Sequence, residues 1–160
     1  MTGHPVQQYV RFFETLQPSA LSQLTAHFDP GARFIDPFND VTGHAAIRRV
    51  FEHMFARCES PRFTVDETVG GGPVIYLRWR FTFGPPKRRR HIDGVSRVSF
   101  GEDGRAVEHV DYWDPAAQLY ETVPLLGHFC RLLRRRLGAE HGQTPKDTAG
   151  PTAVTERNET

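Results

Sequence analysis

The stretch FIDPFNDVTGHAAIRRVFEHMF, residues 34–55, runs from a short apolar segment through an Asp-Pro turn into a helix. The segment 32–36 reads as a short strand, and Asp36 stands where that strand ends. Thr42 or Gly43 can cap the helix that follows. This helix has one wide apolar face, formed at helical spacing by Ile47, Val50, Phe51, Met54 and Phe55.

Two helices are expected before this stretch. Apolar residues recur at helical spacing from Val6 to Leu16, and QPS then interrupts the pattern. Ser19 fits the N-cap of a second, short helix. That helix carries Leu21, Leu24 and Phe28 and is expected to stop at DPG, residues 29–31.

Four β-rich runs follow, at 62–69, 74–83, 90–100 and 106–113, separated by GGGP, GPPKRRR and GEDG. In the second run Ile75, Leu77, Trp79, Phe81 and Phe83 alternate with polar residues, as expected for a strand with one apolar face. Helices followed by such a meander predict an α+β fold, with the helices packed on one side of a curved antiparallel sheet.

A helical pattern returns after Asp114-Pro115. At 124–137, PLLGHFCRLLRRRL, a wide apolar stripe lies opposite crowded arginines. Such a helix packs on its own domain or across a dimer, or it docks a partner protein or an anionic membrane surface. The polar, Pro/Gly/Thr-rich stretch 138–160 is expected to be disordered, so we expect one domain over residues 1–137.

The composition excludes several function classes. The net charge of +1 gives no general attraction to nucleic acid, and the basic run PPKRRRH lacks interleaved aromatic residues, so we expect no nucleic-acid partner. Cys58 and Cys130 match no metal or redox spacing, and the scattered histidines form no HxH or HxxxH pattern, so we expect neither a metal nor a cofactor. The start lacks a secretion signal, and we expect a cytoplasmic protein.

The order of elements, together with FIDPFNDVTGHAAIRRVF and GEDGRAVEHVDYWDP, resembles the nuclear transport factor 2-like superfamily. The likeness is to its ketosteroid isomerase-like and SnoaL-like members and covers residues 5–120. It implies a cone of sheet and helices around a pocket for a small hydrophobic molecule, and a homodimer. Because the superfamily hosts isomerases, cyclases, hydrolases and binding modules, the resemblance predicts the fold more sharply than the function.

The resemblance to ketosteroid isomerases implies a proton-shuttling carboxylate at Asp36. The alternative is a turn role, in which Asp36 accepts backbone N–H bonds. The tyrosine of those enzymes falls at Phe12, with Tyr9 one turn earlier on the same face. Their second donor falls at Asp93 by the local ID pattern, or at Ser96 when counted from the GEDG turn.

Limonene epoxide hydrolases, another branch, use an Arg and an Asp two residues apart on one strand together with a later Asp. Asp111 matches the later Asp and Arg78 matches the Arg. Arg80 occupies the place of the remaining Asp, with the opposite charge. We therefore do not expect epoxide hydrolysis by that set of residues.

His109 and Asp111 stand two apart in an expected strand and so share a face, which makes them an acid/base pair or a structural hydrogen bond. We expect catalytic roles at Asp36, His109 and Asp111. Ligand contacts are expected from Tyr9, Phe12, Phe34, Tyr76, Arg78, Asp93 and Trp113.

Two functions are consistent with these residues. One is proton transfer on a small hydrophobic molecule, of isomerase, cyclase or hydrolase type. The other is a non-catalytic ligand-binding or assembly module that docks a partner or a membrane surface through helix 124–137. The enzyme hypothesis requires that Asp36, His109 and Asp111 face one enclosed space.

Overall fold

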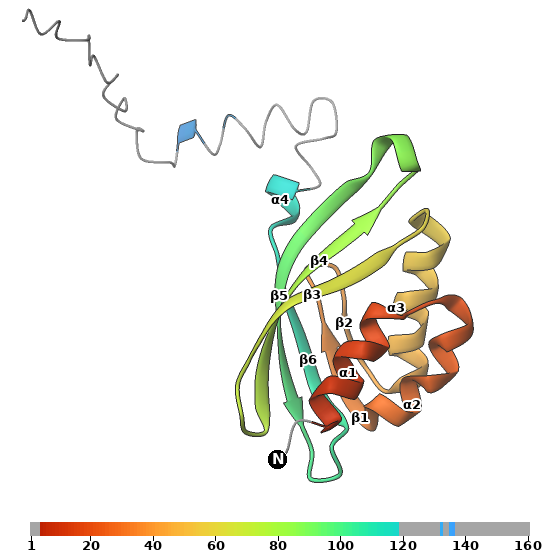
Figure 1. Ribbon diagram of the computed structural model, residues 1–160, viewed down its shortest axis with the longest axis vertical. Coiled ribbons are helices and arrows are strands. Elements are labelled where there is room, and N and C mark those ends of the chain that lie inside the picture. The colour runs from red at the N-terminus through yellow and green to blue at the C-terminus, as the bar shows by residue number, and fades with distance from the viewer. Residues whose placement is uncertain (1–3, 119–131, 133–134, 137–160) are drawn as a thin grey trace, which may run out of the picture.

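The computed structural model describes residues 4–118, 132, 135 and 136. The helices of the N-terminal half gather on one side of a six-stranded sheet (Figure 1). The elements in chain order are α1 His4–Glu14, η1 Pro18–Gln23, α2 Leu24–His27, β1 Phe28–Ile35, β2 Asp40–Thr42, α3 His44–Arg57, β3 Arg62–Val69, β4 Val74–Phe83, η2 Pro86–Arg88, β5 Arg90–Phe100, β6 Ala106–Tyr112 and α4 Pro115–Gln118.

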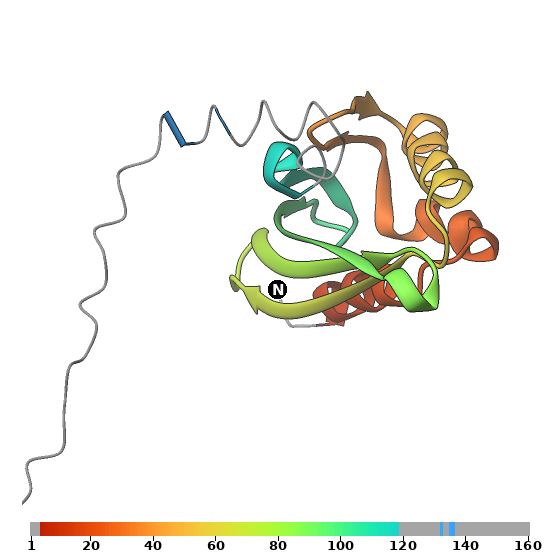
Figure 2. The ribbon, with the colours of Figure 1, turned by 90° about the horizontal axis from the view of Figure 1, so that it is seen from above.

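The sheet has the order β2-β1-β6-β5-β4-β3. Strands β3 to β6 form the antiparallel meander that the sequence predicts. Strand β1 then pairs with β6 in parallel, so the sheet is mixed. Seen from above, the sheet forms an open curve and α3 lies across its open side (Figure 2). The predicted α+β class, with a curved sheet and N-terminal helices packed on it, is confirmed, and the short helix α4 follows the last strand.

The start of β1 differs from the sequence prediction. The short helix ends at His27, and Phe28 begins a strand because it pairs with Ala106 of β6. The register shifts between Phe28 and Arg33, so DPG forms an irregularity inside the strand instead of a helix stop. Asp29 stabilises this turn by accepting the N–H of Gly31 at 2.8 Å.

The core lies between the inner face of the sheet and the helices. Alternation along β4 buries Ile75, Leu77 and Trp79 and turns Tyr76 to the outer face, where it is 46% exposed. The helices contribute further buried residues, namely Tyr9, Phe12, Phe13, Leu24, Ile47 and Phe51. The predicted apolar face of β4 is therefore the wall on which the helices pack.

The pairing of β4 with β5 decides which residues of β5 point inward. The register runs without a shift from Val74↔Ser99 to Phe83↔Arg90, so no bulge turns Asp93 toward the core. Ser96 therefore faces inward and is 2% exposed. Gly94 lies opposite Trp79, and a Cβ on Gly94 would stand 2.4 Å from Cζ2 of that indole. Glycine is therefore required at position 94, because any side chain there would overlap the indole of Trp79.

The expected helix 124–137 and tail 138–160 lie outside the described residues, apart from Leu132, Arg135 and Arg136, which are helical and exposed. No helix in the described part of the chain is long and apolar enough to cross a membrane.

Candidate functional site

A cavity of about 450 Å³ opens between the inner face of the sheet, α1 and α3, which is a usual size for a small-molecule site. Its wall is mainly aromatic, formed by Phe13, Phe34, Phe38, Phe51, Phe63, Trp79, Phe81, Phe83 and Trp113. The polar residues that line it are Asp36, Asn39, His53, Arg57, Cys58, Ser96, His109 and Asp111. The three expected catalytic residues thus border one space.

His109 is held by hydrogen bonds at both ring nitrogens. Its Nε2 lies 2.8 Å from Oδ1 of Asp111, and its Nδ1 lies 2.7 Å from the hydroxyl of Tyr9. Because a carboxylate only accepts, Nε2–H donates to Asp111, and in this tautomer Nδ1 accepts from the hydroxyl of Tyr9. The ring also stacks on Phe34, with centroids 4.9 Å apart and planes at 20°. Its orientation is therefore set from three sides.

Asp111 accepts a second hydrogen bond, from the hydroxyl of Ser96 to the same oxygen, Oδ1. Ser96 in turn accepts the indole N–H of Trp79 at 2.7 Å. The hydrogen bonds thus form two chains that end on Asp111. Tyr9 donates to His109 and His109 to Asp111, while Trp79 donates to Ser96 and Ser96 to Asp111. The second oxygen, Oδ2, accepts no hydrogen bond from the described residues.

This network is largely buried. Tyr9 and His109 are 1% and 2% exposed, and the side chain of Asp111 is 15% exposed. Burial raises the pKa of the Tyr9 hydroxyl well above its ordinary value, and the charge of Asp111 raises it further. Tyr9 therefore stays protonated and serves as a donor to His109.

Asp36 both lines the cavity and forms the turn after β1. Its Oδ1 accepts the backbone N–H of Phe38 at 2.7 Å and that of Asn39 at 2.8 Å. The side-chain amide of Asn39 donates to both carboxylate oxygens, at 3.0 and 2.9 Å. Asp36 therefore has the turn role, with both oxygens occupied by the turn, and it also lines the cavity.

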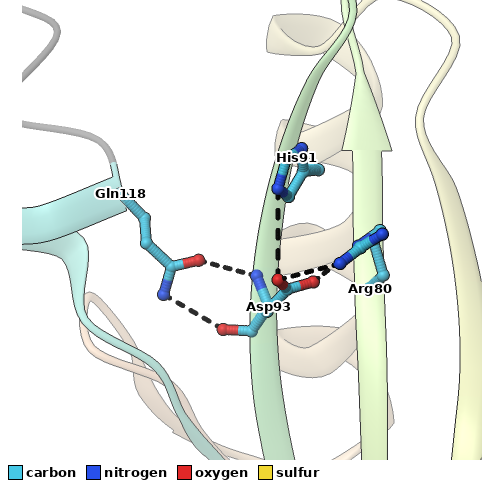
Figure 3. A network of polar contacts seen from close by, with 4 residues as sticks. All are labelled: Arg80, His91, Asp93 and Gln118. Carbon is cyan, nitrogen blue, oxygen red and sulfur yellow. Dashed lines mark hydrogen bonds and ion pairs between the residues drawn. The ribbon is translucent and has the colours of Figure 1, made fainter. Parts of the chain in front are cut away.

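Asp93 points away from the cavity. Its carboxylate pairs with Arg80 at 2.7 Å, and this contact, more than any other, lowers the pKa of Asp93 (Figure 3). The side-chain amide of Gln118 brackets the backbone of Asp93, accepting its N–H at 2.6 Å and donating to its carbonyl at 3.0 Å (Figure 3). Asp93 thus joins the end of α4 to the outer surface of β5.

The other expected ligand contacts divide between the cavity and the rest of the fold. Phe34 and Trp113 line the cavity. Tyr9 and Phe12 are buried behind the wall, and Tyr9 reaches the site through His109. Tyr76 and Arg78 lie on the outer face of β4, because even-numbered residues of that strand alternate away from the core.

Five polar residues of the cavity wall lie outside the set expected from the sequence: Asn39, His53, Arg57, Cys58 and Ser96. Counting from the GEDG turn points to Ser96, whereas the local ID pattern points to Asp93. The unbroken pairing of β4 with β5 selects Ser96. Cys58, just after α3, lines the cavity, and burial raises the pKa of its thiol. No group of three metal-binding side chains gathers among residues 4–118, 132, 135 and 136.

The comparisons with known proteins agree with this architecture. The sequence model of the SnoaL-like domain matches residues 9–109, so the chain belongs to the SnoaL-like domain family, within the nuclear transport factor 2-like superfamily. No curated protein matches the sequence.

Several solved structures share the fold. A SnoaL-like family protein from Agrobacterium tumefaciens is 21% identical, with a TM-score of 0.60 over 71% of this chain and 99% of the other. A protein with a ketosteroid isomerase-like fold from Catenulispora acidiphila, in complex with trimethylamine, is 16% identical, with a TM-score of 0.61 over 74% and 92%. TerC, co-crystallised with polyporic acid, is 15% identical, with a TM-score of 0.59 over 71% and 91%.

Proposed function

We propose that this SnoaL-like protein binds a small hydrophobic molecule in the cavity and moves a proton on it, in an isomerase- or cyclase-type reaction. The observation that carries the proposal is the Asp111 carboxylate at the wall of an aromatic cavity, fixed by His109 and Ser96 through Oδ1. A preorganised, mostly buried carboxylate is suited to general base catalysis. Relatives in fold crystallised with trimethylamine and polyporic acid support a small-molecule site.

In this proposal Oδ2 of Asp111 accepts a proton from a carbon next to a ligand carbonyl. The electron pair of the broken C–H bond stays on the ligand as an enolate, and the protonated Asp111 returns the proton to another atom of the same ligand. His109 positions the carboxylate through Nε2 and is itself positioned by Tyr9. The reaction needs no other reactant, because the proton taken from the ligand is returned to the same ligand.

We place the base at Asp111 and not at Asp36. The four hydrogen bonds from Phe38 and Asn39 occupy both oxygens of Asp36 and hold its carboxylate in the turn. Asp111 keeps one oxygen without a donor among the described residues, next to apolar ring surfaces. Asp36 then shapes the cavity wall, and its substitution tests the assignment.

Deuterium exchange of 2-tetralone, an apolar bicyclic ketone, tests the proposal without knowledge of the natural substrate. In D₂O, wild-type protein is expected to accelerate the loss of the α-proton signals in ¹H NMR above the buffer rate. Asp111→Asn should abolish the acceleration, since the amide does not accept the proton, and Asp36→Asn should keep most of it. If Asp36→Asn lost the accelerated exchange and Asp111→Asn retained it, the general base would be Asp36 and not Asp111.

Binding is followed in parallel through tryptophan emission, because Trp79 and Trp113 both line the cavity and the chain has 2 tryptophans. Tetralone that binds without any accelerated exchange in wild type would overturn the enzyme function and favour a ligand-binding module. Absence of binding together with absence of exchange would overturn the small-hydrophobic-ligand assignment for this probe class.

We also propose that the chain forms a homodimer, as the family resemblance implies. The outer face of the sheet supports this, because Val95 stands opposite Tyr112 on the neighbouring strand and Tyr76 lies on the next strand across. These side chains are 37%, 57% and 46% exposed, respectively. An exposed apolar group of this kind on the face of a sheet is typical of an interface between copies.

A further inference from the structure

The mouth of the cavity is bordered by a concentration of positive charge. Arg57 and His53 lie one turn apart on α3, are exposed, and line the cavity. The C-terminal end of α3 and the turn between β4 and β5 lie toward the same end of the molecule (Figure 1). We call the cations of these two segments the basic rim: Arg57, Arg62, Lys87, Arg88, Arg89 and Arg90.

Contacts hold the two segments of the basic rim together. The N–H of Gly84 donates to the carbonyl of Glu59 at 2.8 Å, and Nη1 of Arg89 donates to the carbonyl of Ser60 at 2.9 Å. Phe83, which precedes the turn, lines the cavity together with Arg57. Within residues 57–62 and 84–90, Glu59 is the single acidic residue, although the whole chain has a net charge of only +1. The positive charge is thus local to the mouth.

The guanidinium of Arg57 has no partner among the described residues, unlike the arginines that form ion pairs on the surface. Arg33, Arg48 and Arg97 form ion pairs with carboxylates at 2.6, 2.7 and 2.8 Å. Among the residues that the structure describes, no hydrogen bond or ion pair engages the side chain of Arg57. A guanidinium is a planar fork that matches a carboxylate with two hydrogen bonds. Arg57 is therefore free to bind an anionic group at the cavity mouth.

We infer that the ligand is an apolar ring system that carries a carboxylate, with the rings inside the cavity and the carboxylate at the mouth on Arg57. This inference rests on the proposed function of the cavity. The orientation follows from charge, because the inner wall already holds the carboxylate of Asp111. A second buried carboxylate beside Asp111 is disfavoured by repulsion and desolvation, whereas the basic rim keeps the anion in water and next to positive charge.

The orientation also fits the proposed chemistry. It directs the uncharged end of the ligand toward Oδ2 of Asp111, which is deeper in the wall than the exposed Arg57. Arg57 is then a specificity-determining residue that selects acids over neutral molecules of the same shape. It takes no part in the transfer of the proton.

A pair of probes of matched shape tests the inference: 9-anthracenecarboxylate and the neutral 9-anthracenemethanol. Each is titrated against the quenching of tryptophan emission from Trp79 and Trp113. Wild-type protein at low salt is expected to bind the carboxylate about fivefold more tightly. Raising the salt from about 0.01 M to about 1 M should reduce this preference, since the Debye length falls about tenfold.

Two substitutions on α3 distinguish a specific effect of Arg57 from the general effect of removing a positive charge from this helix. Arg57→Gln should abolish the preference for the carboxylate and leave the affinity for the neutral probe unchanged. Arg49→Gln should behave as wild type, because Arg49 is an exposed arginine of the same helix that does not line the cavity. Unchanged thermal unfolding of both variants shows that the comparison reports binding and not folding.

The outcomes distinguish this inference from the function on which it rests. Equal affinity of wild type for both probes, or a preference that survives Arg57→Gln, overturns the role of Arg57 while the cavity remains a ligand site. Failure of both probes to bind overturns the inference together with the ligand-binding function.

Discussion

The hydroxyl of Tyr9 lies 2.7 Å from Nδ1 of His109, although 100 residues separate them in the chain. This contact joins α1 to β6 in the core and decides which nitrogen of His109 points its hydrogen at Asp111. The same hydrogen bond therefore helps to hold α1 on the sheet and to orient the proposed acid/base pair. Damage to either side chain is expected to affect both folding and chemistry.

Tyr9→Phe is expected to lower the free energy of unfolding by about 1–3 kcal/mol, because Nδ1 of the buried His109 loses its donor. The exchange of 2-tetralone should slow as well, since the imidazole is no longer held in one tautomer. Urea unfolding and the NMR exchange assay measure the two effects. Tyr76→Phe, which removes an exposed hydroxyl on the outer face, should leave both unchanged.

The raised pKa of Tyr9 predicts a loss of stability at high pH. The hydroxyl ionises more readily in the unfolded chain, near its ordinary pKa of 10.0, than in the folded protein. The stabilisation is therefore complete below pH 10.0 and is lost above it, at about 1.4 kcal/mol per pH unit for this single group. Urea unfolding from below to above this pH should show a steeper fall for wild type than for Tyr9→Phe. Equal slopes would contradict the assignment.

Gly94→Ala is expected to destabilise the protein by about 1–3 kcal/mol, because the new methyl group would collide with the indole of Trp79. The displaced indole should also loosen its hydrogen bond to Ser96 and change the tryptophan emission. Gly71→Ala provides the control, as no atom lies within 4 Å of a Cβ at that position. Similar stabilities for the two variants would show that Trp79 does not lie over Gly94.

The thiol of Cys58 is expected to react slowly with iodoacetamide at neutral pH, because burial raises its pKa above 9.0. The reaction rate should therefore rise with a midpoint above pH 9.0, and a bound ligand should protect the thiol, which lines the cavity. A Cys130→Ser background isolates the Cys58 signal, and mass spectrometry follows the modification. A midpoint below 9.0 in the folded protein would contradict this environment.

Tyr112→Lys is expected to shift the proposed homodimer toward monomer in sedimentation experiments, since it places a charge within the exposed apolar group of Tyr76, Val95 and Tyr112. Val69→Lys, at an exposed site on the edge strand β3, should leave the sedimentation coefficient unchanged. A monomeric wild-type protein, or a dimer that withstands Tyr112→Lys, would rule out this face as the interface.

Much of the fold follows from local pattern. The 3.6-residue period marks α1 and α3, and the two-residue period marks β4, because each period places apolar side chains on one face regardless of what they pack against. The same alternation predicts that His109 and Asp111 share a face, and they do, 2.8 Å apart. These features depend on neighbours in sequence, so the amino-acid sequence by itself determined them.

The rest depended on pairings between distant segments. Phe28 lies in a strand because Ala106 is its partner, and Ser96 faces the cavity while Asp93 does not because β4 and β5 pair without a bulge. The short-range pattern is the same in either register, and only the long-range hydrogen bonds select one. Tertiary structure therefore decided which polar groups meet Asp111, and it brought Arg57 to the mouth of the same cavity.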